Sequence, residues 1–145
     1  MSRLWKMKMI ADVVLAICMA ACRASDDKPK TAEALPQTTN GNFVLYVSNQ
    51  SSDLSPVDIT VEIDGKKSLS ADFAVGTGHN WTKHTFQLAP GKHKIVAISQ
   101  RGSARLEKDI EVKDKHWAVI DYWFATRDGK KHLTFRIQDT PIMFR

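Results

Sequence analysis

The chain has 145 residues and a formal net charge of +5, with 43% hydrophobic residues, two cysteines and five histidines. This length suits one domain and is short for two. Residues 1–21 hold three basic side chains against Asp12, so the rest of the chain carries a formal charge of only +3. A positive charge this small, spread over a whole domain, does not indicate nucleic-acid binding, which requires a clustered basic face.

The first 22 residues have the organisation of a secretory signal. Residues 1–8 are short and basic, residues 9–21 are apolar apart from Asp12, and two alanines precede Cys22. The apolar stretch is shorter than the roughly 20 residues that span a bilayer, which argues against a permanent transmembrane helix. Because Asp12 disfavours membrane insertion, an ordinary cleaved signal and an uncleaved anchor remain alternatives to the interpretation that follows.

Met19-Ala20-Ala21-Cys22 resembles the lipobox of bacterial lipoproteins, whose usual form is Leu-(Ala/Ser)-(Gly/Ala)-Cys. The resemblance implies cleavage after residue 21, diacylglycerol on the Cys22 thiol, and acylation, as by palmitate, of the new N-terminus. It also implies a location, because Arg23 stands where an Asp retains such lipoproteins at the inner membrane of Gram-negative bacteria. We therefore expect an outer-membrane lipoprotein that faces the periplasm. Cys18 would leave with the signal, so the mature fold would contain no disulfide.

Residues 22–41 are predicted to form the lipidated cysteine and a flexible tether. The stretch after Cys22 has two prolines, charges of both signs and one large aliphatic residue, Leu35. Such a composition cannot bury enough apolar surface to offset the entropy of ordering. A coil of this length spans about 25 Å on average. A short strand around Leu35 is the alternative.

From Asn42 onward the apolar residues recur with a period of two, which is typical of strands. Residues 57–63 show the cleanest alternation of apolar and polar residues. Residues 116–125 are the most apolar, so we expect this strand to be central in its sheet and buried on both faces. Asp121 conflicts with this expectation, because it is a charged residue within an apolar strand. The predicted strands occupy residues 43–48, 57–63, 68–75, 81–88, 93–99, 104–112, 116–125 and 133–137. Residues 42–145 are therefore predicted to form an all-β fold, a single antiparallel immunoglobulin-like β-sandwich of about seven to eight strands.

The turn at Asp64-Gly65 raises a question of register. A two-residue loop would place Leu69 on the wrong face of its strand, because side chains alternate between the two faces. We therefore predict a three-residue loop over residues 63–65, with Gly65 left-handed and Leu69 opposite Ile59.

Leu88-Ala-Pro-Gly-Lys-His-Lys-Ile95 resembles the Leu-x-Pro-Gly-x-His-x-Ile/Leu phrase of bacterial immunoglobulin-like and transthyretin-like accessory domains. The resemblance implies a sandwich rather than a closed barrel, and it implies no activity.

Sequence motifs of enzymes are missing: the chain has neither a Gly-x-Ser-x-Gly elbow nor a Gly-rich phosphate loop before a helix. No catalytic residue and no cofactor are predicted. His84 and His93 flank the Pro90-Gly91 turn and are candidate cross-strand neighbours, but the histidine spacing is not that of a zinc site, so no metal is predicted. Trp81 adjoins a polar loop that contains His79, and these two residues are the candidate ligand contacts.

Two functions from different classes follow. The first is a non-catalytic binding or assembly module, anchored to a membrane by lipid on Cys22, that meets another envelope protein by a sheet face or edge. The alternative is a carbohydrate- or peptidoglycan-binding module that contacts cell-wall polymer. It is suggested by Trp81 and by lysine-rich turns that would form a shared basic end, namely Lys66-Lys67, Lys92 to Lys94, Lys113 to Lys115 and Lys130-Lys131.

Overall fold

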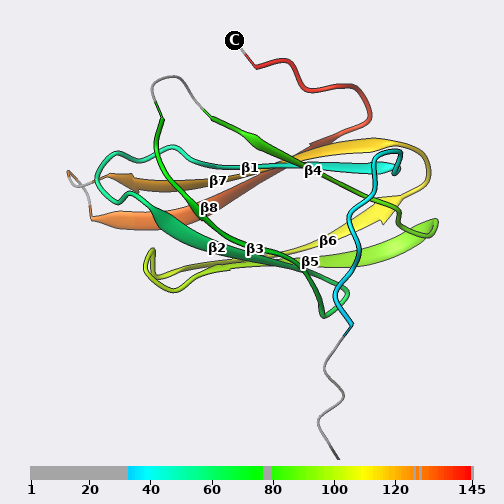
Figure 1. The fold of residues 1–145 in the computed structure, drawn as a ribbon, viewed down its shortest axis with the longest axis horizontal. Helices are drawn as coiled ribbons and strands as arrows, with labels where there is room; N and C mark the ends of the chain where they lie inside the picture. Colours follow the sequence, from blue (N-terminus) through cyan, green and yellow to red (C-terminus); the bar gives the residue numbers. More distant parts are fainter. Residues whose placement is uncertain (1–32, 77–79, 126, 128, 145) are drawn as a thin grey trace, which may run out of the picture. The chain divides into compact units, whose positions relative to one another are not determined.

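The computed structural model of this chain describes residues 33–76, 80–125, 127 and 129–144. The predicted signal, Cys22 and His79 lie outside the described residues. The described residues form eight strands (Figure 1). They are β1 (Phe43–Asn49), β2 (Val57–Ile63), β3 (Lys66–Phe73), β4 (Thr82–Phe86), β5 (Gly91–Ser99), β6 (Ala104–Val112), β7 (His116–Ala125) and β8 (Lys130–Gln138). No helix among these residues is long and apolar enough to cross a membrane.

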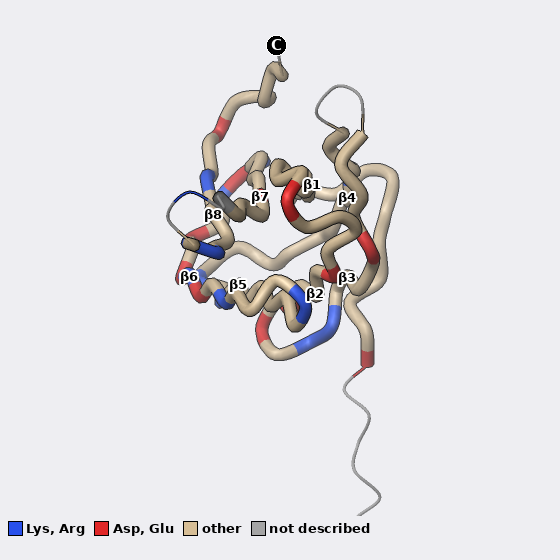
Figure 2. The backbone as a smooth tube through the Cα atoms, turned by 90° about the vertical axis from the view of Figure 1, so that its left-hand side faces the viewer, with Lys and Arg blue, Asp and Glu red and all other residues tan. Residues whose placement is uncertain are grey.

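The strands pack as two layers, which Figures 1 and 2 show from two sides. Sheet A has the order β4-β1-β7-β8, and sheet B has the order β3-β2-β5-β6. Neighbouring strands are antiparallel except β1 and β7, which are parallel. The predicted all-β sandwich is confirmed. In this sandwich β1 and β2 lie in opposite sheets, whereas the first two strands of a constant-type immunoglobulin domain pair within one sheet.

The hydrophobic core lies between the sheets and follows the alternation of the sequence. In β2 every second residue is buried and the residues between them are half-buried, as the pattern predicts. Burying a large aliphatic or aromatic side chain completely stabilises the fold by about 1.5–3 kcal/mol. The largest completely buried side chains are Phe43, Leu45, Ile59, Ile63, Phe86, Ile95, Ile120 and Tyr122.

The β2–β3 hairpin corrects the predicted register. Its loop has two residues, Asp64 and Gly65, with φ angles of 52° and 73°, as a type I′ turn requires. A bulge between Val61 and Glu62 then shifts the pairing, so that Leu69 lies opposite Val61 and not opposite Ile59. The predicted three-residue loop is therefore wrong. The bulge adds one residue to β3, where the prediction had added one to the loop. With this extra residue the Leu69 side chain faces the core.

Strand β7 is central in sheet A, as predicted, because β1 and β8 flank it. On its inner face Ile120 and Tyr122 are completely buried, and on its outer face Val119 and Asp121 are almost completely buried. Trp123, which also lies on the outer face, is 42% exposed. The prediction that β7 is buried on both faces therefore holds for the middle of the strand. It does not hold for its C-terminal end, where Trp123 is exposed.

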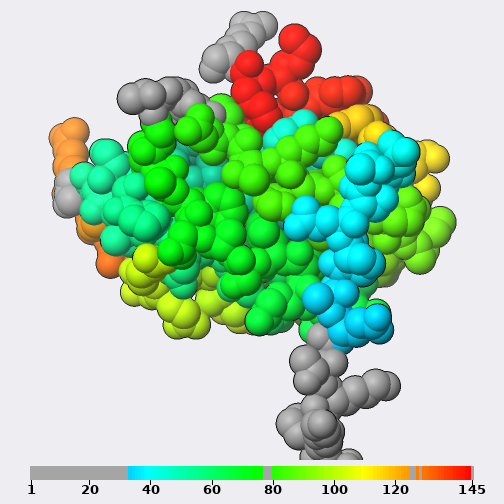
Figure 3. All heavy atoms as spheres, viewed as in Figure 1, coloured from blue at the N-terminus to red at the C-terminus, as the bar shows by residue number. Residues whose placement is uncertain are grey.

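The last residues of the predicted tether contact the sandwich. The N–H of Leu35 donates a hydrogen bond to the carbonyl of Lys67 in β3, and the N–H of Thr38 donates to the carbonyl of Thr85 in β4, at 3.1 and 2.9 Å. Leu35 also packs against the core. Figures 1 and 3 show this segment in cyan, crossing from one layer to the other on the side where β3 and β4 are the sheet edges. Residues 35–41 therefore join the two edge strands β3 and β4 on that side.

Candidate functional site

The two histidines that flank the Pro90-Gly91 turn lie in different layers. His84 belongs to β4 and pairs with Leu45 in sheet A, whereas His93 belongs to β5 and pairs with Ile110 in sheet B. The prediction that they are cross-strand neighbours is wrong, because the chain passes from one sheet to the other between them. Within the described residues, no group of three or more His, Cys, Asp or Glu side chains could hold a metal ion.

His84 has a structural environment. Its Nδ1 lies 3.1 Å from Oε1 of Gln37, and its Nε2 is buried without a hydrogen-bond partner among the described residues. Burial lowers the pKa of His84, because a charged ring would lose its hydration. The neutral ring with its proton on Nδ1 fits both observations, since Nδ1 then donates to Gln37 and only an acceptor is left unpaired. His84 therefore joins β4 to the segment that precedes β1.

His93 connects two turns at one end of sheet B. Its Nδ1 lies 2.6 Å from Oδ2 of Asp64, and its Nε2 lies 2.7 Å from the carbonyl oxygen of Ala89. Both ring nitrogens thus face acceptors, which only the doubly protonated ring satisfies. Burial by itself lowers the pKa of His93, but the hydrogen bonds to Asp64 and Ala89 outweigh burial and the pKa is raised. The pair holds the β2–β3 turn against the start of β5.

Asp121 lies beneath a polar cluster on the outer face of sheet A. Its Oδ1 accepts hydrogen bonds from the hydroxyl of Ser48 at 2.6 Å and from Nε1 of Trp81 at 2.9 Å. Its Oδ2 lies 3.6 Å from a guanidinium nitrogen of Arg136, and the side chain of Asp121 is 5% exposed. The carboxylate therefore positions the Trp81 ring. This role explains why a charged residue occurs within the apolar strand β7.

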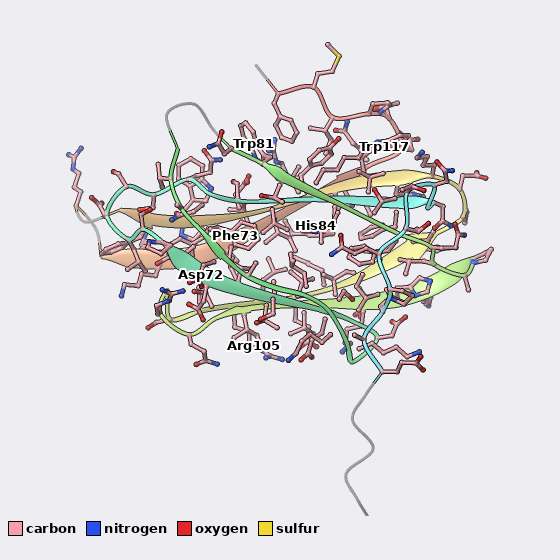
Figure 4. All side chains as sticks on the ribbon, viewed as in Figure 1. Asp72, Phe73, Trp81, His84, Arg105 and Trp117 are labelled. Atoms are coloured by element: carbon pink, nitrogen blue, oxygen red, sulfur yellow. The ribbon has the colours of Figure 1, made fainter. Side chains whose placement is uncertain are left out.

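The Trp81 ring is covered from the other side by a residue that the sequence analysis did not single out. Phe144 stacks on Trp81 with ring centroids 4.0 Å apart and planes 18° apart, and it meets Tyr46 edge-on at 4.9 Å. Residues 140–144 run above the outer face of sheet A (red in Figure 1), and Figure 4 places Trp81 and Trp117 on that same face. Trp81 is half-buried. The ligand contact at Trp81 stays a prediction, and the one at His79 lies outside the described residues.

The lysine-rich turns do not all share one end of the sandwich. Lys66-Lys67, Lys92 to Lys94 and Lys113 to Lys115 lie at the end where β5 begins and β6 ends, whereas Lys130-Lys131 begins β8 at the opposite end. Acidic residues are interleaved with the lysines (Figure 2), as in the contact of Lys94 with Glu107 at 2.7 Å. The prediction of one shared basic end is therefore wrong for the β8 lysines. At the other three turns, neighbouring carboxylates partly neutralise the positive charge.

A groove of about 740 Å³ runs between β6 and β8, the two edge strands on the side opposite residues 35–41. Its apolar part is formed by Ile110, Phe135 and Ile137. Sequence reasoning missed this groove, because the alternation of a strand does not tell which strands become edges. The remaining residues that line it are Lys108, Asp109, Glu111, His116, Gln138 and Asp139.

Comparison of the chain with models of known protein families, with curated proteins and with solved structures found no match.

Proposed function

We propose that this protein is a non-catalytic binding or assembly module of the cell envelope, held by lipid on Cys22 at the outer membrane and facing the periplasm. The observation that carries the binding role is the open side of the sandwich, where two nine-residue edge strands flank a groove lined by three apolar side chains and six polar or charged residues. The membrane attachment rests on the resemblance of Met19-Ala20-Ala21-Cys22 to a lipobox.

The environments of the polar groups support binding over catalysis. Asp121 accepts two hydrogen bonds on one oxygen and contacts Arg136 with the other. Both nitrogens of His93 are engaged by acceptors. A general acid or base must reach the proton of a substrate, and these two groups are already committed to holding the fold together.

The anchor is tested by the intact mass of the protein in the membrane fraction, for the wild type and for Cys22→Ala. We expect a lipid-sized mass increment on the wild type and its loss in the variant. A wild type that is released as a soluble mature chain contradicts the anchor.

The binding side is tested in intact cells with a photocrosslinking amino acid placed at Ile137, in the groove, or at Lys83, an exposed residue of β4. We expect the same envelope protein to be captured repeatedly from position 137 and not from position 83. Equal capture at both positions, or capture at neither, contradicts the proposed role of the open side.

A second candidate, a carbohydrate- or peptidoglycan-binding module, is favoured by Trp123. This ring is 42% exposed on the outer face of sheet A, where Trp117 also lies half-buried with the Nζ of Lys115 5.6 Å from its ring centroid. Exposed aromatic rings on a sheet can stack on sugar rings. If this function holds, Trp123→Ala weakens binding to purified sacculi about threefold to tenfold, the range expected for one ring contact. Unchanged binding in Trp81→Ala would remove the role predicted for Trp81.

A further inference from the structure

Four strands form the edges of the described sheets, and an unprotected edge can pair with a strand of another chain. Two of these edges are protected. Strand β4 has only five residues, and β3 is interrupted by a bulge in its pairing with β2. Both also receive hydrogen bonds from the segment that crosses them, at Lys67 and Thr85. Short length, bulges and a covering segment are the devices by which natural sheets prevent edge pairing.

The third edge, β6, is protected by a charge. Lys108 falls in the row of β6 that includes Leu106 and Ile110, whose side chains face the other sheet, and Lys108 lines the groove. A strand added beside β6 would have to bury this ammonium group among apolar side chains. An inward-pointing charge of this kind disfavours pairing.

The fourth edge, β8, lacks these devices over its second half. It has nine residues, contains no proline, and pairs with β7 without a register shift in the part described. Its lysines are confined to the first two positions. Its inward row is apolar and becomes more exposed along the strand, because Leu133 is buried, Phe135 is half-buried and Ile137 is 37% exposed. This half of β8 borders the groove.

The charge of β8 indicates which strand it would accept. The strand contains Lys130, Lys131 and Arg136 and no acidic residue. Like charges directly opposite each other destabilise a strand pair, and opposite charges stabilise it. A second copy of β8 would add three more cations to the same edge, whereas an acidic strand would be attracted. The outward row of β8, which includes His132 and Arg136, is the row that acidic side chains would face.

The lining of the groove determines the other face of that strand. Phe135, Ile137 and Ile110 favour apolar side chains in this row. The incoming strand must therefore place apolar residues toward the groove and acidic residues on the opposite face. Because strand side chains alternate, one alternating sequence satisfies both rows.

We propose that the outer edge of β8 binds an extended segment of a partner protein that alternates apolar and acidic residues and adds to sheet A as a fifth strand. Residues 133–138 of β8 provide about 20 Å of edge, from six residues at about 3.3 Å each. The groove of about 740 Å³ has the capacity of a typical ligand site. This inference rests on the proposed function and identifies the partner-binding surface of that module.

The test uses the full-length chain in mild detergent and two synthetic ten-residue peptides as probes, one alternating Glu and Val and the other alternating Lys and Val. Fluorescence anisotropy measures affinity, and amide hydrogen exchange locates the bound peptide. We expect the Glu–Val peptide to protect residues 133–138 and to bind at least tenfold more tightly than the Lys–Val peptide. Added salt should reduce this preference, because exposed charges are screened.

Two variants test the two rows separately. Ile137→Asp places a carboxylate in the apolar row and should weaken binding of the Glu–Val peptide tenfold or more. His132→Glu adds a negative charge to the outward row and should lower the affinity for the Glu–Val peptide at least threefold while raising that for the Lys–Val peptide. Gln87→Glu is the matched control, since it adds one negative charge next to β4, and it should change either affinity less than twofold. Circular dichroism verifies that each variant is folded.

Several results would overturn the inference. They are equal affinity for both peptides, no binding of either at millimolar concentration, protection of another edge, and a dimer of the chain that protects β8 without peptide. Failure of the peptides together with specific capture of a partner from position 137 would refute strand addition at β8 and leave the envelope-module function standing. Failure of both experiments would refute both.

Discussion

The replacement of Asp121 by alanine tests whether this carboxylate organises the outer face of sheet A. The change leaves the hydroxyl of Ser48 and the Nε1–H of Trp81 without their acceptor, and Ser48 is completely buried. A buried donor that loses its partner costs about 1–3 kcal/mol. The lost contact with Arg136 adds less, because the Arg136 side chain is 68% exposed. We expect Asp121→Ala to lower the free energy of unfolding by about 3–4 kcal/mol.

Asp121→Asn is the matched variant, since its amide oxygen can still accept both hydrogen bonds. We expect it to cost only about 1 kcal/mol, mainly from the lost charge. Urea unfolding at pH 7, followed by tryptophan fluorescence and by circular dichroism, measures both values. Asp114→Asn, at an exposed turn residue, serves as the control and should stay within about 0.5 kcal/mol of the wild type. A loss below 1 kcal/mol for Asp121→Ala, or equal losses for both Asp121 variants, would refute this reasoning.

Three further outcomes follow from the packing. The raised pKa of His93 means that its ion pair with Asp64 stabilises the fold fully below about pH 6.5 and is lost as pH rises through the folded-state pKa. His93→Gln should therefore cost about 1 kcal/mol at pH 6 and less at pH 9, and an equal cost at both would contradict the ion pair. Gly102→Ala would place a Cβ 2.4 Å from the ring of Tyr122 and should cost about 3 kcal/mol in urea unfolding, so a neutral result is incompatible with this packing. Phe144→Ala should cost about 1–2 kcal/mol and increase acrylamide quenching of tryptophan fluorescence; unchanged quenching would show that the stack does not shield a ring.

Local alternation in the sequence was sufficient to predict the strands. The alternation of β2 was predicted correctly because a strand with one face on a core must alternate. The predicted register of the β2–β3 hairpin was wrong because two different structural features can each orient the Leu69 side chain toward the core. A longer loop and a bulge each add one residue, and the sequence around Asp64-Gly65 does not distinguish them.

The candidate sites depended on contacts between segments that are distant in the sequence. Asp121 stood out as a polar residue in an apolar strand, but its partners on β1 and before β4 became visible only when these segments came together. The contact of Phe144 with Trp81 has no local signal at all, since residues 140–144 show no periodicity.

The amino-acid sequence by itself determined the eight strands, the all-β class and the chemistry available to each strand face, because these depend on neighbours within a few residues. The tertiary structure alone decided the order of the strands in the two sheets, and with it which edges residues 35–41 contact and which edge stays open at β8. The physical reason is that edge protection is a property of pairing. Lys108 and the bulge of β3 can protect an edge only because β6 and β3 are edge strands. The apolar row from Leu133 to Ile137, which becomes more exposed along β8, is a candidate binding surface only because no described strand pairs with the outer side of β8.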